Sequence, residues 1–186
     1  MKRFFDLTLA LLSIPILLLP GALISLSIIL TSKGPSIHWS NRVGRNKQIF
    51  KMPKYRTMRI DTPQKATHLL EDPDLFITPI GSLLRKTSLD ELPQIWSILK
   101  GEMSFVGPRP ALFNQEDLIQ LREQRGINSL VPGLTGWAQI NGRDELSISD
   151  KVELESEYFK KQSLLFDIVI IAKTIINAFK SKEISH

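Results

Sequence analysis

The sequence predicts an α+β protein, mainly α-helical, with an apolar N-terminal membrane helix, a small β-hairpin and a compact helical domain. Residues 7–32 contain no charged side chain, whereas residues 33–186 carry 40 of the 43 charged side chains. Residues 36–52 contain two short strand-like runs, and several later segments have apolar residues at helical spacing. We therefore expect two parts, residues 1–32 in the membrane and residues 33–186 docked on its surface.

Composition excludes several classes of protein. The chain has 186 residues, a net charge of +5 and no cysteine, so disulfides, thiolate metal sites and a cysteine nucleophile are ruled out. Only one long uncharged stretch exists, which excludes a membrane protein of many helices. The 154 residues that follow this stretch are enough to bury a core of their own.

The uncharged stretch favours a helix that enters and leaves the membrane by one face. Seventeen of residues 7–30 are apolar, and no small-residue cleavage site follows, which disfavours a signal peptide. A straight helix over residues 7–32 would measure about 39 Å and could span the bilayer. Pro20-Gly21 interrupts it, however, and cations flank both ends. Positively charged flanks mark the cytoplasmic side of a membrane segment. A bend at Pro20 would keep both flanks on that side, whereas a simple span would place Lys2 and Arg3 outside.

A strongly basic segment follows. Residues 33–60 carry eight cations and no anion, which suits anionic lipid, nucleic acid or a phosphate-bearing substrate at the membrane surface. Apolar side chains are interleaved with the cations, which indicates a folded segment with a buried face. We expect two strands, roughly 36–42 and 47–52, joined by a turn at 42–46.

The remaining elements are read in order along the chain. Residues 61–76 are polar and predict a loop, in which His68 is expected to be an ordinary exposed residue. Helices are expected at 80–86, from Ser88 to Gly101, and at 147–162. Residues 131–143 are rich in glycine and predict a loop that can approach a ligand closely. Residues 163–180 predict an amphipathic helix at the membrane interface or packed on the domain.

Two adjacent carboxylates, Asp90 and Glu91, are the strongest candidates for chemistry. They stand at or just before a predicted helix N-terminus, where Ser88 and Glu91 fit a capping box and Pro93 offers a competing start. The helix dipole is expected to lower the pKa of both. They could serve only as caps. Nearby cations favour instead an aspartate that attacks phosphorus and a glutamate that holds Mg²⁺. Arg109, between two prolines, is suited to fix a guanidinium on phosphate.

In combination, these motifs resemble the monotopic phosphoglycosyl transferases, which are bacterial sugar transferases of capsule, O-antigen and glycoprotein pathways. The resemblance covers almost the whole chain. It rests on the Lys-Arg-x-x-Asp start and on the signature segments 54–58, 88–94, 100–110 and 132–143. Two departures stand out. Leu19 precedes Pro20 where the family commonly has serine, and Tyr55 replaces the usual phenylalanine.

The resemblance implies a specific reaction. The family transfers a sugar-1-phosphate from a nucleotide sugar, usually UDP-linked, to polyprenol phosphate, with Mg²⁺ and a covalent aspartyl-phosphosugar intermediate. Asp90 would then be the nucleophile and Glu91 its partner near the metal. The cations that match the family's phosphate-binding residues are Lys54, Arg56, Arg85, Arg109 and Arg143.

The resemblance also implies a location and partners. The membrane helix would be re-entrant, and the enzyme would lie on the cytoplasmic face of the bacterial inner membrane, in contact with its lipids. Nucleic acid would not be a partner, and an oligomer is possible. The alternative from another class is a membrane-anchored module that binds nucleic acid or anionic lipid without catalysis.

Overall fold

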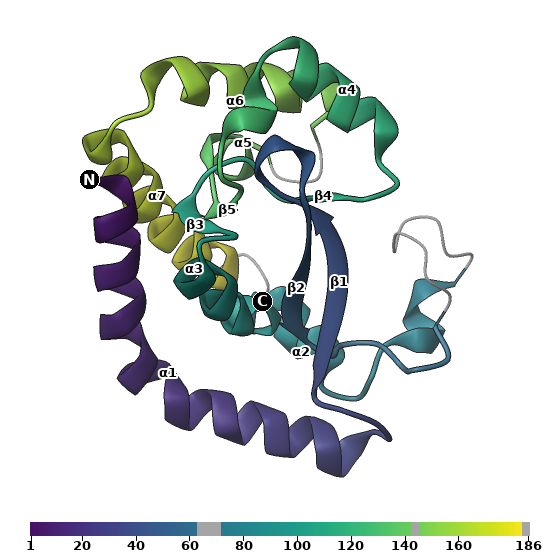
Figure 1. Cartoon of the computed structure of the whole chain (residues 1–186). Helices are drawn as coiled ribbons and strands as arrows, with labels where there is room; N and C mark the ends of the chain where they lie inside the picture. The colour runs from purple at the N-terminus through teal and green to yellow at the C-terminus, as the bar shows by residue number, and fades with distance from the viewer. Residues whose placement is uncertain (63–71, 143–145, 184–186) are drawn as a thin grey trace.

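The computed structural model describes residues 1–62, 72–142 and 146–183. It confirms the α+β, mainly α-helical class: a long N-terminal helix lies along one side of a small domain whose β-hairpin is surrounded by helices (Figure 1). The predicted loop position His68 and the predicted cation Arg143 lie outside the described residues.

Two small sheets organise the domain. The larger is antiparallel, in the order β2-β1-β4, and pairs Ile37 with Tyr55 at one end of the hairpin and Val43 with Ile49 at the other. The smaller consists of the parallel pair β3-β5. The strands are β1 (Ile37–Val43), β2 (Ile49–Tyr55), β3 (Ser104–Val106), β4 (Ala111–Leu112) and β5 (Gly133–Thr135).

Helical segments connect and cover these sheets. The α-helices are α1 (Lys2–Thr31), α2 (Gly81–Lys86), α3 (Ile95–Lys100), α4 (Glu116–Gln124), α5 (Trp137–Ile140), α6 (Ile148–Lys161) and α7 (Leu164–Glu183). The 3₁₀ helices are η1 (Arg45–Lys47), η3 (Pro73–Phe76), η4 (Leu89–Gln94) and η5 (Ile127–Ser129).

The expected hairpin and the helices near 80–86, 147–162 and 163–180 are confirmed within a few residues. At the start of α6 the Ser147 hydroxyl accepts a hydrogen bond from the Asp150 amide, which caps the helix as its composition suggests. Residues 131–143 are not simply a loop, since they form β5 and α5. Their glycines allow close contact between backbones. A Cβ on Gly107 would lie 2.4 Å from the Val131 carbonyl oxygen, so the 107–110 turn packs directly on this segment.

α1 is continuous but changes direction midway, as the purple ribbon in Figure 1 shows. Pro15 and Pro20 lie inside it, and each removes a backbone hydrogen bond, which permits the bend. Within the described ranges it is the one helix long and apolar enough to cross a membrane, and only 6% of its most apolar window is buried. Membrane contact is therefore expected along most of its surface.

The N-terminal end of α1 is fixed to the domain by charged contacts. Lys2 Nζ lies 2.5 Å from Oδ2 of Asp167 on α7, a carboxylate that is 1% exposed. Asp6 Oδ1 accepts hydrogen bonds from Ser104 Oγ at 3.0 Å and from the backbone amide of Phe105 at 3.1 Å. The Lys-Arg-x-x-Asp start therefore docks the apolar helix onto α7 and β3.

The C-terminal half of α1 is fixed to the same domain. Ile28 is fully buried against Tyr55 of β2 and Leu84 of α2. The Tyr55 hydroxyl donates a hydrogen bond to the Gly21 carbonyl oxygen at 2.9 Å, and a Cβ on Gly21 would lie only 2.8 Å from that hydroxyl. Glycine is thus required at position 21 by the close approach of β2 rather than by backbone flexibility alone.

Candidate active site

The carboxylate pair lies on η4, at the edge of the hairpin. Ser88 precedes η4 in a left-handed conformation, with φ of 56°, and its side chain makes no capping hydrogen bond. The predicted capping box is therefore wrong: Pro93 sits inside a tight 3₁₀ turn, and the α-helix begins only at Ile95. Gly101 ends that helix in a left-handed conformation, as expected.

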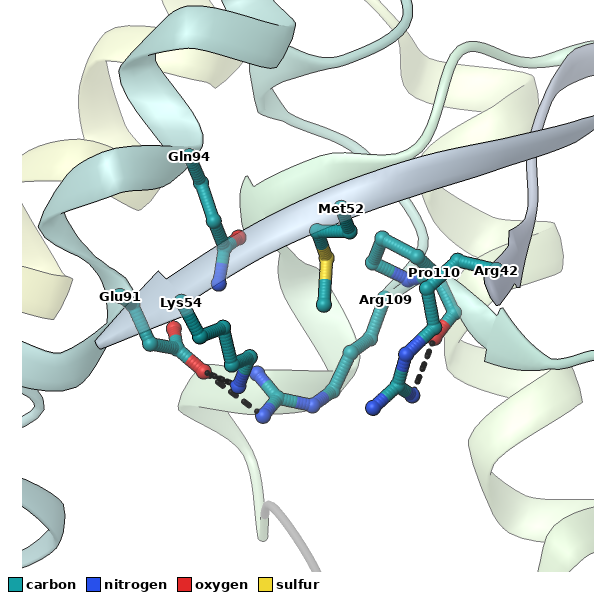
Figure 2. A pocket seen from close by; sticks show the side chains of 7 residues that line it. All are labelled: Arg42, Met52, Lys54, Glu91, Gln94, Arg109 and Pro110. Carbon is teal, nitrogen blue, oxygen red and sulfur yellow. Dashed lines mark hydrogen bonds and ion pairs between the residues drawn. The ribbon is translucent and has the colours of Figure 1, made fainter. Parts of the chain in front are cut away.

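Two predicted cations meet the carboxylates. Lys54 Nζ on β2 lies 2.7 Å from Glu91 Oε1 and 3.8 Å from Asp90 Oδ2. Arg109 Nη2 lies 2.9 Å from the same Glu91 oxygen. Figure 2 shows the Lys54 ammonium and the Arg109 guanidinium side by side at the same Glu91 oxygen. The structure thus brings together four residues from three separate segments of the chain.

The two carboxylates are electrostatically different. Burial opposes ionisation of Glu91, yet Arg109 and Lys54 together hold its pKa at about 2. Burial raises the pKa of Asp90 above its usual value, and the Glu91 charge adds to the rise, while Lys54 and Arg85 oppose it. The prediction of a lowered pKa is confirmed for Glu91 and wrong for Asp90, because desolvation of the Asp90 carboxylate outweighs the attraction of its cations.

Arg85 stands close to this pair, on the last turn of α2. Its Nε donates to the Thr57 hydroxyl at 2.9 Å, and its charge favours the ionised form of Asp90. Arg85 therefore belongs electrostatically to the same site.

Arg56 lies elsewhere. It is 5% exposed, and its guanidinium donates to the carbonyl oxygens of Ser32, Gly34 and Pro35, where α1 ends. Ser32 is the C-cap of α1 and the other two residues follow it, so the guanidinium binds the backbone that leaves the helix, and its charge is favourable near the helix C-terminus. The structure thus uses Arg56 to attach the membrane helix to β2.

Arg42 and Gln94 are residues of this pocket that sequence reasoning did not single out. The pocket is lined by Arg42, Met52, Lys54, Glu91, Gln94, Arg109 and Pro110 (Figure 2). The antiparallel register pairs Arg42 with Phe50, which places Arg42 on the same sheet face as Met52 and Lys54. Strand alternation across the hairpin could have identified Arg42 from the sequence, had the register been known.

The carboxylates also suit a divalent cation bound together with substrate. Among the described residues no cluster of three or more acidic or histidine side chains exists. Mg²⁺ commonly binds one or two protein carboxylates together with substrate phosphates and water. Asp90 and Glu91, adjacent at the pocket, fit that mode rather than a cage made of protein alone.

Comparison with known proteins identifies the family of the chain. The family model described as bacterial sugar transferase matches residues 1–181. An exopolysaccharide production protein, ExoY, of Sinorhizobium fredii is 39% identical over 94% of this chain and 83% of its own length.

Two further relatives carry names that state a reaction. The UDP-glucose:undecaprenyl-phosphate glucose-1-phosphate transferase of Escherichia coli is 39% identical over 98% of this chain. The undecaprenyl-phosphate glucose phosphotransferase of Komagataeibacter xylinus is 40% identical over 94% of it. The aligned region spans 41% and 35% of the lengths of these two relatives, so both contain additional sequence.

Proposed function

Because the chain belongs to the bacterial sugar transferase family, we propose that it transfers a sugar-1-phosphate from a UDP-sugar to undecaprenyl phosphate, releasing UMP. This reaction would be the first membrane step in making an exopolysaccharide, capsule or O-antigen. The observation that carries the proposal is the buried Asp90-Glu91 pair held between Lys54 and Arg109. Cations around a carboxylate that can attack phosphorus are what displacement at a pyrophosphate requires.

The two carboxylates would have different roles in the reaction. Glu91 accepts hydrogen bonds from two cations and has a pKa of about 2, so it is a weak base that positions Lys54 and Arg109. Asp90, whose pKa is raised, is the more basic carboxylate and makes a longer 3.8 Å contact with Lys54. We therefore assign the nucleophile to Asp90.

The proposed reaction has two displacements. An Asp90 oxygen attacks the sugar-bearing phosphorus, and the bond from that phosphorus to the UMP oxygen breaks. An oxygen of undecaprenyl phosphate then attacks the same phosphorus and releases the Asp90 carboxylate. Lys54, Arg85 and Arg109 would stabilise the charge on the phosphoryl oxygens. Mg²⁺ bound by Asp90 and Glu91 would supply further stabilisation of that charge.

Turnover itself is the first prediction. The full-length protein in detergent or nanodiscs, given undecaprenyl phosphate and a panel of UDP-sugars with Mg²⁺, should release UMP with at least one sugar. Release should require the lipid acceptor beyond the first turnover and should stop when EDTA removes the metal. A protein that makes no lipid-linked sugar from any member of the panel would contradict the proposed function.

The arrangement of α1 supports a re-entrant position on one membrane face. Its N-terminal end is held to α7 and β3 by Lys2 and Asp6, and its C-terminal end is held to β2 by Arg56. Since both ends contact the same domain, α1 as arranged here would dip into one leaflet. Large apolar side chains remain exposed along α1 and α7: Phe4, Leu11, Leu12, Ile16, Leu18, Leu19, Leu23, Leu26, Ile29, Leu30, Leu165, Ile168, Val169, Ile175 and Ile176.

Topology is the second prediction. The chain has no native cysteine, so one cysteine inserted after Met1, or Lys33→Cys in a separate variant, gives a unique label. Both positions should react with a membrane-impermeant maleimide only after the inner membrane is opened, because we place both ends on the cytoplasmic face. Labelling of the N-terminal cysteine in cells whose inner membrane is intact would show instead that α1 spans the bilayer.

A further inference from the structure

Arg42 stands in the active-site pocket without a carboxylate in hydrogen-bonding contact. Its Nε donates to the Ser40 hydroxyl at 3.1 Å, and its Nη1 donates to the Pro110 carbonyl oxygen at 3.3 Å. Both acceptors are neutral. Among the described residues no Asp or Glu oxygen lies within 4.0 Å of this guanidinium. In Figure 2 its guanidinium lies beside that of Arg109, on the side of the pocket away from Glu91.

Among the described residues, the charged groups of the pocket around Arg42 are mainly cationic. Glu91 already accepts from Lys54 and Arg109, so it is shared between two cations before Arg42 is counted. Burial and then repulsion from Arg109 lower the pKa of Arg42 to about 10, with only partial compensation from Glu91. Arg42 is therefore still charged at neutral pH. A desolvated cation beside another cation is stabilised by an anion that contacts both.

Gln94 provides a second, independent sign of a ligand. Its side chain lines the same pocket and points into it, although the residue is only 2% exposed (Figure 2). Its amide makes no hydrogen bond to another described residue, yet it is not among the side-chain groups that are fully buried without a partner. The amide is therefore open to the pocket and available to a ligand. A phosphate oxygen at this position would satisfy the Gln94 amide.

We propose that Arg42 and Gln94 form a subsite for one phosphate monoester, occupied first by the departing UMP and then by undecaprenyl phosphate. This inference rests on the two-step reaction of the proposed function. In each displacement the phosphate that leaves or enters must lie opposite Asp90, in line with the bond that breaks or forms. UMP therefore departs from the position that the lipid phosphate later takes. In Figure 2 Arg42 lies across the pocket from Glu91, the neighbour of Asp90 in sequence, beyond the Lys54 ammonium and the Arg109 guanidinium.

Binding of UMP tests the subsite without turnover. Calorimetry on the full-length protein in nanodiscs should show that Arg42→Gln binds UMP about tenfold more weakly than wild type, or worse, since charge-assisted hydrogen bonds to phosphate are lost. Arg45→Gln is the matched control: Arg45 lies in the turn that follows β1, donates to the Ser129 carbonyl oxygen and is exposed. It should bind UMP as wild type does.

Gln94→Met is a second variant, needed because Arg42→Gln would also weaken UMP binding if it disturbed folding. It keeps the side-chain volume and every charge in the pocket. It should also weaken UMP binding severalfold. The inference is overturned if wild type does not bind UMP, or if both variants bind it like wild type. Arg42-dependent UMP binding in a protein that turns over no UDP-sugar would reject the proposed function and leave the subsite standing.

The two occupants can be separated in single-turnover experiments. Enzyme loaded with labelled phosphosugar and freed of UMP is mixed with undecaprenyl phosphate, and transfer is timed. Arg42→Gln should slow this second step about tenfold or more, as it slows the first step with UDP-sugar, because one subsite serves both phosphates. If only one of the two steps is slowed, the shared subsite is rejected. In steady state, UMP should compete with the lipid acceptor.

Discussion

Asp90→Asn is expected to abolish transfer, with a fall in turnover of at least about 10⁴-fold, since loss of a covalent nucleophile removes the reaction path itself. The amide is isosteric with the carboxylate but cannot attack phosphorus. Folding should survive. Among the described residues the shortest ion-pair contact of Asp90 is that with Lys54, at 3.8 Å, and burial already disfavours its charged form. The measurement is UMP release alongside thermal unfolding and membrane retention.

A labelled adduct gives the second readout. Wild type incubated with UDP-sugar labelled in the sugar, without acceptor, should retain acid-precipitated label, and Asp90→Asn should retain none. Asp117→Asn, at an exposed position on α4, is the matched control and should be labelled like wild type. Full activity in Asp90→Asn would reject the nucleophile assignment. A membrane-anchored binding module without catalysis would show no adduct in either protein.

Local pattern was sufficient for the outline of the fold. A turn signal between two runs of interleaved apolar residues predicted the hairpin. An amphipathic pattern predicted α2 and α7, and the order of acidic and then basic residues predicted α6. The short parallel pair β3-β5 was not predicted. Each strand has three residues and depends on contact with a segment far along the chain, so neither carries a periodic signal of its own.

The residues of the candidate site were predictable from the sequence, but the groups that each of them contacts were not. Lys54, Asp90, Glu91 and Arg109 were identified from signature segments, and the structure brings them together. Arg56 belongs to the same basic stretch as Lys54, yet it is buried under the end of α1. Lys54 and Arg56 are two residues apart, so strand alternation alone would place both on one face. Arg56 lies one residue beyond the end of β2 and contacts the end of α1, which the sequence does not reveal.

The burial of charged side chains was the feature hardest to predict from the sequence. Glu155 lies among the acidic residues in the first half of α6, a pattern typical of an exposed helix surface. It is nevertheless 2% exposed and accepts hydrogen bonds from Arg122 on α4 at 2.7 and 2.5 Å. Asp167 interrupts the apolar sequence of α7, yet it is 1% exposed and accepts hydrogen bonds from Lys2 and from the Tyr158 hydroxyl. Composition records a charge but not the partner that buries it.

The Arg122-Glu155 pair is where a single substitution should cost the most stability. Arg122→Met is expected to lower the free energy of unfolding by about 3–5 kcal/mol, because it leaves the Glu155 carboxylate buried without its partner. The exposed pair Lys47-Glu123 is the control, with side chains 47% and 55% exposed. Lys47→Met should cost no more than about 1 kcal/mol. Denaturant unfolding in one detergent compares the two variants.

The same pair should influence catalysis through Arg109. Arg122 Nη2 donates to the Arg109 carbonyl oxygen at 2.9 Å, so the buried ion pair anchors the turn that presents Arg109 to Glu91. Replacing both partners, Arg122→Met with Glu155→Leu, should recover most of the lost stability, since no buried charge is left unpaired. It should not recover turnover, because the Arg109 carbonyl still lacks its donor. A double variant that regains full activity would show that Arg122 acts only on stability. A single variant within about 1 kcal/mol of wild type would show that the pair contributes little to folding.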